Sequence, residues 1–491
     1  MRQTLRRSCA ACAKSKHSCD LRIPSCSRCI KRNVSCLYAN EPLAAPSARP
    51  EHGAVITSPE ALTTLTAYRI GSLDPFESYP QTRLPRVHVQ RLIHHFVNKI
   101  AFEYYPLDLN ATSNPFLISW WPLALGDPAL FHVSLQTASL DEELSARKGF
   151  RTSELLMADS VALLRRKIED VSLAVQDGTM NSVITLAAIE FGKGNTKVSG
   201  MHVEGVKKLV GLRGGINSVR QTSPLTARMI SWVSMLVMGY PQFQTQDDVG
   251  IGDGIPAIPE WQLDSTALKQ DDLSDLGYLD IDISVKNVFV RLRNAFKRAQ
   301  HIPFHPTRLH DLTCFVIHRL LLPTPTSTDL QSSSPITECI RCAIILDMFI
   351  IQGQTYYSHA VILNTIVTRF IDHLKELDSS PHVYDNLDAW FCAIGMMASP
   401  DIALHYSWFV ERAHVTAISL NLANWEDTIL RIKSVLWLER IQDEQIVRCH
   451  WDRILNAVNQ PEAQSLLDLD RSKDTAQTLY KIQSNIPHNQ E

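Results

Sequence analysis

Six of the 11 cysteines lie in one short segment near the start of the 491-residue chain. A C-x2-C pair followed by a further cysteine six residues on occurs there twice. The six residues are Cys9, Cys12, Cys19, Cys26, Cys29 and Cys36. Residues 1–7 lack an apolar stretch, so we expect no secretory signal. Clustered thiols in such a chain favour metal binding over disulfide formation. The spacing therefore predicts a metal centre built from thiolates.

The number of thiolates suggests how the metal is held. Two tetrahedral zinc ions need eight ligand positions, so six sulfurs are enough only if two of them bind both metals. The repeated spacing points to the first cysteine of each half, Cys9 and Cys26, as these bridges. We expect two Zn²⁺ per chain as the cofactor. A segment this short cannot bury a useful apolar core, so metal binding should supply most of its folding free energy.

The charge of the chain is unevenly distributed. The net charge is −3, yet residues 1–40 hold nine Lys or Arg against one acid, Asp20, while the rest of the chain carries −11. Six thiolates with two Zn²⁺ would leave this head with a charge of about +6. A small basic head on a large acidic body suggests a module that binds a polyanion.

This segment resembles the zinc binuclear cluster (Zn2Cys6) family of fungal transcription regulators. Besides the six cysteines, the resemblance includes Lys16 before the third cysteine, Asp20 after it and Pro24 before the fourth. It implies double-stranded DNA as the partner. It also implies two short helices, the first with its C-terminal end in the major groove over a CGG triplet. Lys16 would then read the bases, and Pro24 would shape the loop between the halves.

Other basic residues of the head are candidates for phosphate contacts, which need only a reachable charge. These are Arg6, Arg7, Lys14, Arg28, Lys31 and Arg32. Ala13 stands where the family often has Arg, and Ser15 and Ser18 occupy two further positions that are often basic. An alternative function therefore remains: a ligand-sensing helical regulatory protein whose DNA binding is weak and non-specific.

The rest of the chain divides by composition. Residues 41–85 contain seven prolines and predict an extended linker, in which a coiled coil cannot form. Residues 86–458 show helical periodicity and predict a large all-α regulatory domain, followed by a polar tail over residues 459–491. Scattered positions in residues 74–215, among them Gly194, Asn195, His202 and Gly205, resemble the helical middle region of fungal regulators.

Apolar stripes in the body have helical spacing. One runs from Met157 to Val175, a second from Ile402 to Leu420 and a third from Trp425 to Leu436. A common core explains them best; a seam for a homodimer is the alternative. The sequence Leu212 to Gly215 predicts a helix that ends on glycine. The best case for a strand, Asp280–Val285, is short.

Residues 246–284 form an acidic segment with ten Asp or Glu and one Lys, interleaved with bulky apolar side chains. This composition is typical of activation segments that bind a coactivator or the transcription machinery. An acidic surface loop between helices explains it equally well. The composition is therefore consistent with an activation segment and with a surface loop.

Other candidate sites are weaker. Cys339 and Cys342 form a lone C-x2-C inside an apolar stretch, where buried reduced thiols are a better explanation than a second metal. His301, His305, His310 and His318 near Cys314 are interpreted as ordinary histidines. Common hydrolase and nucleotide-binding motifs do not occur, so we expect no enzyme. The chain has no apolar run of about 18 residues that could span a membrane. We therefore expect a nuclear transcription activator that acts without a membrane.

Overall fold

A computed structural model describes the chain in eight stretches: residues 9–19, 26–36, 79–107, 110–147, 149–262, 280–322, 334–379 and 385–459. Most of the predicted linker, the centre of the acidic segment and nearly all of the predicted tail lie outside these residues. Contacts divide the chain into two compact units, Met1–Arg69 and Ile70–Glu491.

The first unit holds two five-residue helices, α1 (Ala10–Lys14) and α2 (Ser27–Lys31), which pack against each other. Its buried side chains are almost all cysteines, and Ala11 and Cys19 pack against them. This unit therefore has a core of sulfur rather than of aliphatic groups, as expected for a head whose folding depends on metal.

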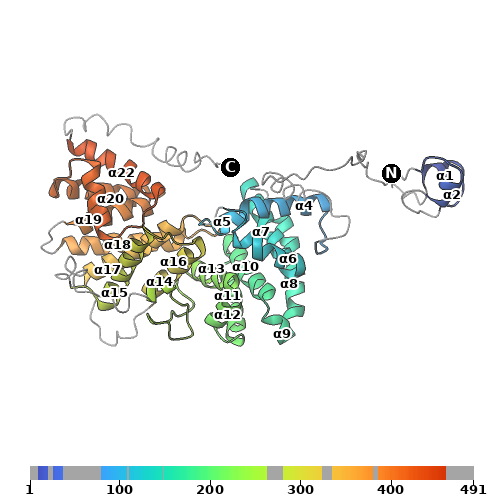
Figure 1. Cartoon of the computed structure of the whole chain (residues 1–491), viewed down its shortest axis with the longest axis horizontal. Helices are drawn as coiled ribbons and strands as arrows, with labels where there is room; N and C mark the ends of the chain where they lie inside the picture. The colour runs from blue at the N-terminus through green and yellow to red at the C-terminus, as the bar shows by residue number, and fades with distance from the viewer. Residues whose placement is uncertain are drawn as a thin grey trace. The chain divides into compact units, whose positions relative to one another are not determined.

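The second unit is a stack of helices around one apolar core (Figure 1). In its described residues no β-strand occurs, and the single isolated bridge joins Thr245 to Ile255. Its first half comprises α4 (Arg86–His95), η1 (Phe96–Ile100), α5 (Ala101–Tyr104), η2 (Phe116–Trp120), α6 (Trp121–Gly126), α7 (Pro128–Ala146), α8 (Arg151–Ile168), α9 (Val171–Ala174), α10 (Asp177–Gly192), α11 (Thr196–Leu212), α12 (Ile216–Thr222) and α13 (Pro224–Met238). Its second half comprises α14 (Pro259–Gln262), α15 (Ile283–Ala299), α16 (Pro306–Leu321), α17 (Pro335–Gln352), α18 (Ala360–Asp378), α19 (Asn386–Ala398), α20 (Ala403–Ser419), α21 (Trp425–Val435) and α22 (Ile441–Asn459).

Helices α7 and α10 form the centre of the first half. They pack against each other, and α8, α11 and α13 cover them. Both are buried on nearly every side although they carry several hydroxyl side chains. These hydroxyls are satisfied within the helix: Thr137 donates to the carbonyl of Val133 and Ser182 to that of Gly178. A serine or threonine can therefore lie in this core with its hydroxyl paired.

Helices α17 and α19 play the same part in the second half, where α16, α18, α20, α21 and α22 surround them. Helix α19 approaches α20 closely at Gly395, because a Cβ at this position would overlap the ring of Phe409. Buried Arg412 of α20 donates to Asp388 of α19 at 2.7 Å and also pairs with Asp378. The position of α20 is thus fixed by both packing and charge.

The two halves of this unit are joined by buried ionic contacts. Asp311 of α16 is 4% exposed and accepts two hydrogen bonds each from Arg220 and Arg228, at 2.8–3.0 Å. Arg220 lies in α12 and Arg228 in α13, so one carboxylate holds both helices to α16. Burial acts to raise the pKa of Asp311, but the bonds from the two guanidinium groups outweigh it and lower the pKa.

The helical prediction for the body is confirmed, with corrections in detail. The stripes of α20 and α21 face the core: Phe409, Ala413, Ile429 and Ile432 are buried. The stripe that starts at Met157 matches the buried face only in part. Of its members only Leu164 is buried, whereas Met157 and Val161 are half-buried and Ile168 and Val171 are exposed. The buried residues of α8 are Ser153, Leu156, Ser160 and Leu164. Because Ser153 and Ser160 lie on the buried face of α8, a pattern based on apolar residues does not detect that face.

Two local predictions have opposite outcomes. The glycine stop is confirmed, because α11 ends at Leu212 and both Gly214 and Gly215 have positive φ, 90° and 93°. The short strand Asp280–Val285 is wrong. Asp282 instead caps the N-terminus of α15 by accepting from the amide of Ser284 at 2.8 Å. An aspartate before a helical run is a strong start signal.

The described flanks of the acidic segment are part of the fold. Trp261 is fully buried, and its indole donates to Asp248, which also accepts from Asn287 at 2.5 Å. Glu260 pairs with Arg308. The leucines and the tyrosine between residues 263 and 279 lie outside the described residues. The surface-loop interpretation therefore fits the flanks, and the activation hypothesis now concerns the centre alone.

Candidate metal centre and nucleic-acid interface

The two halves of the head repeat one local structure. Cys9 and Cys26 each stand at the N-cap of a short helix, and each sulfur accepts a hydrogen bond at 3.4 Å from the amide three residues on, that of Cys12 or Cys29. An N-cap side chain satisfies an amide that the first helical turn leaves unpaired. The same sulfurs that begin the helices are therefore turned toward the other cysteines.

Both helices also end in the same way. Lys16 and Asn33, each seven residues after the first cysteine of its half, have left-handed φ angles of 52° and 48°. The next residue then donates back to the carbonyl of the second cysteine: His17 to Cys12 at 3.0 Å and Val34 to Cys29 at 3.1 Å. The chain turns sharply here, and this brings the third cysteine of each half back to the other two.

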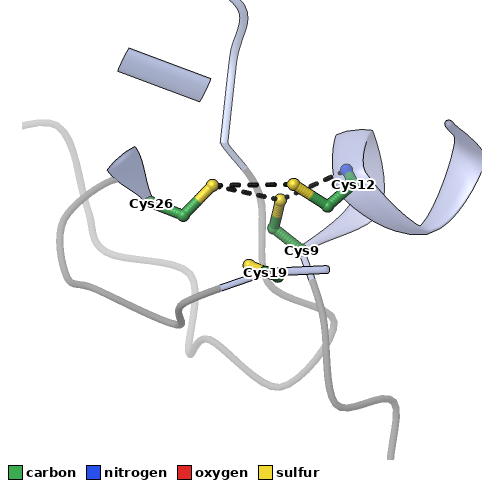
Figure 2. Close-up of side chains that lie close together, drawn as sticks. All are labelled: Cys9, Cys12, Cys19 and Cys26. Carbon is green, nitrogen blue, oxygen red and sulfur yellow. Dashed lines mark hydrogen bonds between the residues drawn. The ribbon is translucent and has the colours of Figure 1, made fainter. Parts of the chain in front are cut away.

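The six sulfurs form two overlapping groups. Within each group, all four sulfur atoms lie within 4.8 Å of one another. The first group is Cys9, Cys12, Cys19 and Cys26; the second is Cys9, Cys26, Cys29 and Cys36. Figure 2 shows the side chains of the first group converging, with dashed lines from Cys26 to Cys9 and to Cys12. The two groups share Cys9 and Cys26, which belong to different halves.

The spacing of the sulfurs fits tetrahedral zinc. A tetrahedron with zinc–sulfur bonds of about 2.3 Å has sulfur–sulfur edges of about 3.8 Å. The Cys9–Cys26, Cys9–Cys29 and Cys12–Cys26 sulfur pairs are 3.9, 3.6 and 3.7 Å apart. These separations are far too long for disulfide bonds.

The close packing of these sulfurs disfavours thiolates unless a cation is bound. Burial, together with hydrogen bonding to the sulfurs of Cys9 and Cys26, raises the pKa of the Cys12 thiol to about 12. Neighbouring thiolates repel one another, and without a cation the protonated forms are favoured. A divalent metal reverses this preference, because it deprotonates the thiols that coordinate it.

Comparison with protein families agrees with this geometry. Residues 7–44 match the fungal Zn(2)-Cys(6) binuclear cluster domain. The chain carries a zinc binuclear cluster domain. This domain binds two zinc ions, as the sequence predicted. Residues 91–239 match the fungal specific transcription factor domain, which spans α4 to α13 nearly completely.

The two domains support a role for the chain as a fungal DNA-binding transcription factor. The predicted resemblance and the helical class of the body are thus confirmed. No curated protein matches the chain, and no solved structure does. Among the helices that the structure describes, none combines the length and the hydropathy that crossing a membrane requires.

The basic residues of the head lie around the sulfur core, on the outside. Lys14, Lys16, Arg28, Lys31 and Arg32 are all exposed. Lys14 and Lys31 are the last residues of α1 and α2, and Arg32 caps α2. Lys16 stands apart from the rest because it follows the end of α1 in the left-handed turn. Arg6 and Arg7 lie outside the described residues.

The serines that depart from the family pattern differ in role. The hydroxyl of Ser15 donates to the carbonyl of Ala11 at 2.8 Å and so helps to close α1. Ser18 is exposed. Sequence reasoning missed the role of Ser15, although a serine just after a short helix is a familiar signal for a hydroxyl–carbonyl bond.

The weaker candidate sites lie in the second unit. Cys339 and Cys342 are buried in α17, and neither belongs to a group of metal ligands among the described residues. His310 and His318 are buried in α16, where burial lowers the pKa of each to about 4 and keeps both neutral. His305 caps α16, and His301 is exposed. These histidines serve the fold at separate places.

Proposed function

We propose that this protein regulates a set of fungal metabolic genes transcribed by RNA polymerase II, by recognising CGG triplets in the nucleus. The observation that supports it most is the pair of sulfur groups that share Cys9 and Cys26. Such a centre needs two metals to hold the head together, and a head held in this way presents basic residues rather than an apolar face. Its natural partner is a nucleic acid.

The ligands in this proposal are the six clustered cysteines. Cys9 and Cys26 bridge the metals, and the other four are terminal ligands: Cys12, Cys19, Cys29 and Cys36. The zinc ions would complete two tetrahedra and fix the relative position of α1 and α2. Each helix is only five residues long, too short to be stable alone in water. Metal binding thus accounts for the existence of the helices.

Base reading in this proposal falls to Lys16. Its ammonium can donate to O6 and N7 of guanine, which present paired acceptors in the major groove. The side chain is exposed and lies beyond the end of α1, so the helix itself does not block its approach to a base. A left-handed lysine is uncommon, and a strained residue at this turn is consistent with a functional requirement.

Phosphate contacts are assigned to the remaining basic residues of the head. Lys14, Arg28, Lys31 and Arg32 support this because they are exposed. Arg6 and Arg7 are included from their charge and their place in the sequence alone. Contacts of this kind set affinity and orientation but carry no sequence information.

The rest of the chain is assigned to regulation. We propose a head over residues 1–40, a linker over 41–85, a helical regulatory domain over 86–458 and a polar tail over 459–491. The centre of the acidic segment 246–284 would contact a coactivator and make the protein an activator. Because the prolines of residues 41–85 disfavour a coiled coil next to the head, we propose that any homodimer would form through the helical body. No catalytic role is proposed.

The test is duplex binding by the full zinc-loaded chain. Affinity for a CGG-containing duplex and for a scrambled duplex is measured over a range of salt concentrations. The proposal requires a preference for CGG that persists near physiological salt, where non-specific binding weakens steeply. Equal affinity for both duplexes, lost together as salt rises, would favour the alternative of a ligand-sensing protein with non-specific DNA binding.

A further inference from the structure

Helix α20 carries a second stripe of largely apolar residues, on the side opposite its core face. The core face is formed by buried Phe409, Ala413 and Thr416. The second stripe consists of Leu404, Trp408, Glu411, Val415 and Ile418. At 3.6 residues per turn, these five positions lie within about 40° of one line along the helix, and the core residues lie roughly 120–180° away from it. The second stripe therefore points away from the core.

Most of this stripe is open to solvent. Leu404, Val415 and Ile418 are 78%, 46% and 53% exposed, and Trp408 is half-buried. Single apolar side chains on a surface need no explanation, but a contiguous group of them marks an interaction site. A partner that covered this stripe would remove several large apolar groups from water.

A cleft of about 290 Å³ lies beside the first half of the stripe, between α18 and α20 (Figure 1). Helix α20 lines it with Leu404, Trp408 and Glu411, and α18 adds Asp372 and Lys375. The Lys375 ammonium lies 3.8 Å from the carboxylate of Asp372, and both side chains are more than half exposed. Such a pair is weak, so Lys375 can also contact a second carboxylate at the rim of the cleft.

The spacing of the stripe indicates what kind of partner fits it. Its members follow one another in steps of four, three, four and three residues, which is the heptad spacing of helices that pair side by side. A helix with the same spacing is therefore the best complement. Helix α20 of a second copy of the chain has it.

One antiparallel register of two α20 helices suits both the shape and the charge of the stripe. It places Leu404 of one copy opposite Val415 of the other, and Trp408 opposite Glu411, because both pairs are centred on the same point of the helix. This arrangement is two-fold symmetric, as homodimer interfaces commonly are. The two Glu411 side chains avoid each other, and each reaches the cleft that Lys375 and Trp408 of the other copy line. The charges of the two copies are then complementary.

We propose that the chain forms a two-fold homodimer through antiparallel packing of α20, with Glu411 of each copy against Lys375 of the other. The inference rests on the proposed function only in placing the homodimer in the helical body, and it adds the surface and the register. The interface is small, so we expect reversible association with a dissociation constant on the order of 1–100 µM. Recognition of CGG by the head does not depend on it.

The first experiment tests the apolar stripe in the full zinc-loaded chain. Sedimentation velocity over roughly 1–200 µM should show the wild type passing from monomer to dimer. Leu404→Arg should stay monomeric, because it places a charge in the apolar seam. The control Leu212→Arg changes a leucine that is 64% exposed at the end of α11 and lies outside the cleft. This control should dimerise like the wild type, and circular dichroism checks that both variants fold.

The second experiment tests the register through its charges. Lys375→Glu and Glu411→Lys should each weaken the dimer about tenfold or more, because like charges then meet at both ends of the seam. An equal mixture of the two single variants should dimerise again, since each mixed dimer restores two pairs of opposite charge. Both positions are exposed, so these variants should fold and decide the matter even if Leu404→Arg folds poorly.

Three results would overturn the proposal. One is a wild-type chain that remains monomeric up to about 200 µM, beyond the expected range of association. Another is a dimer that persists in Leu404→Arg. The third is a mixture of the two charge variants that dimerises no better than either variant alone. Affinity for the CGG duplex, measured at nanomolar chain concentrations where the chain is monomeric, reports separately on the proposed function.

Discussion

Lys16 and Asn33 occupy equivalent positions in the two halves of the head, and both have a left-handed backbone, with φ of 52° and 48°. Asparagine adopts this conformation readily, whereas lysine does so rarely. The backbone of the turn therefore suits Asn33 better than Lys16. The difference between the two halves lies in the side chain that the turn presents and not in its geometry.

This equivalence gives a clean test of base reading. Lys16→Asn should keep the turn and two zinc ions per chain, because the new residue suits the left-handed conformation. It should lower affinity for a CGG duplex by about 1–3 kcal/mol and affect a scrambled duplex little. Fluorescence anisotropy with labelled duplexes measures both affinities. The control Asn33→Gly, also compatible with the turn, should keep the preference for CGG. An equal loss on both duplexes for Lys16→Asn would make Lys16 a phosphate contact.

The shared sulfurs predict unequal effects of cysteine substitutions. Cys9→Ser or Cys26→Ser removes a sulfur from both groups, whereas Cys19→Ser or Cys36→Ser removes one from a single group. We expect the first pair to lose zinc and helical structure at higher zinc concentrations than the second pair. Native mass spectrometry and a zinc titration measure this. A wild-type chain with one zinc ion would be incompatible with the bridged centre.

Lys31 and Arg32 should act on DNA without regard to sequence. Lys31→Ala or Arg32→Ala should weaken binding to CGG and scrambled duplexes by similar factors. Each should also reduce the slope of log affinity against log salt concentration by about one unit, since one phosphate contact releases about one counterion. Lys197→Ala, in the second unit, is the control and should change neither quantity. A loss confined to the CGG duplex would assign base contacts to α2 as well.

Asp311 should make the body sensitive to acid. Its folded-state pKa is lowered, so its stabilising effect is fully present above the unfolded value, near 3.9. The effect is lost as pH falls below that value through the folded pKa. At neutral pH, Asp311→Asn should lower the free energy of unfolding by about 3–5 kcal/mol, because it leaves two guanidinium groups uncompensated.

Unfolding by denaturant at neutral and at acidic pH checks this expectation. The difference between wild type and Asp311→Asn should shrink as pH falls below about 4. Asp401→Asn removes an exposed carboxylate and should change stability little at either pH. A difference that stays constant with pH would mean that Asp311 acts through shape rather than through charge.

The centre of the acidic segment should carry the activating function. In the full chain, replacement of Leu273, Leu276, Tyr278 and Leu279 by Ala should abolish activation of a CGG-driven reporter, because partner grooves bind apolar side chains. DNA binding by the purified variant should be unchanged. Trp261 is left intact because it is buried in the fold. Full reporter activity in the variant would support the surface-loop hypothesis for the centre as well.

The metal centre could be predicted from the sequence because it depends on the type and spacing of residues within one short segment. Spacing alone placed Cys9 and Cys26 as shared sulfurs, and the two sulfur groups contain both. The left-handed turn at Lys16 was not readable, because lysine carries no signal for it. Asn33 occupies the equivalent position in the second half, and asparagine favours a left-handed backbone. The repeat of the cysteine spacing could therefore have predicted the same turn at Lys16.

In the body, periodicity failed where hydroxyls replace apolar groups. Ser160 lies on the buried face of α8, and its hydroxyl donates to the carbonyl of Leu156 at 2.8 Å. Because the hydroxyl is paired, its burial does not leave an unsatisfied donor. A stripe that counts only apolar residues therefore passed through half-buried Met157 and Val161 and met the buried face only at Leu164.

The sharing of sulfurs between halves has a consequence for how the head is held together. Each four-sulfur group takes three members from one half and one from the other. With the ligands that we propose, neither half can complete a tetrahedron by itself, so each metal acts as a crosslink. The peptide between Cys19 and Cys26 then only keeps the partners within reach. A head cleaved in that stretch should persist as two fragments joined by zinc, and should separate when a chelator removes it.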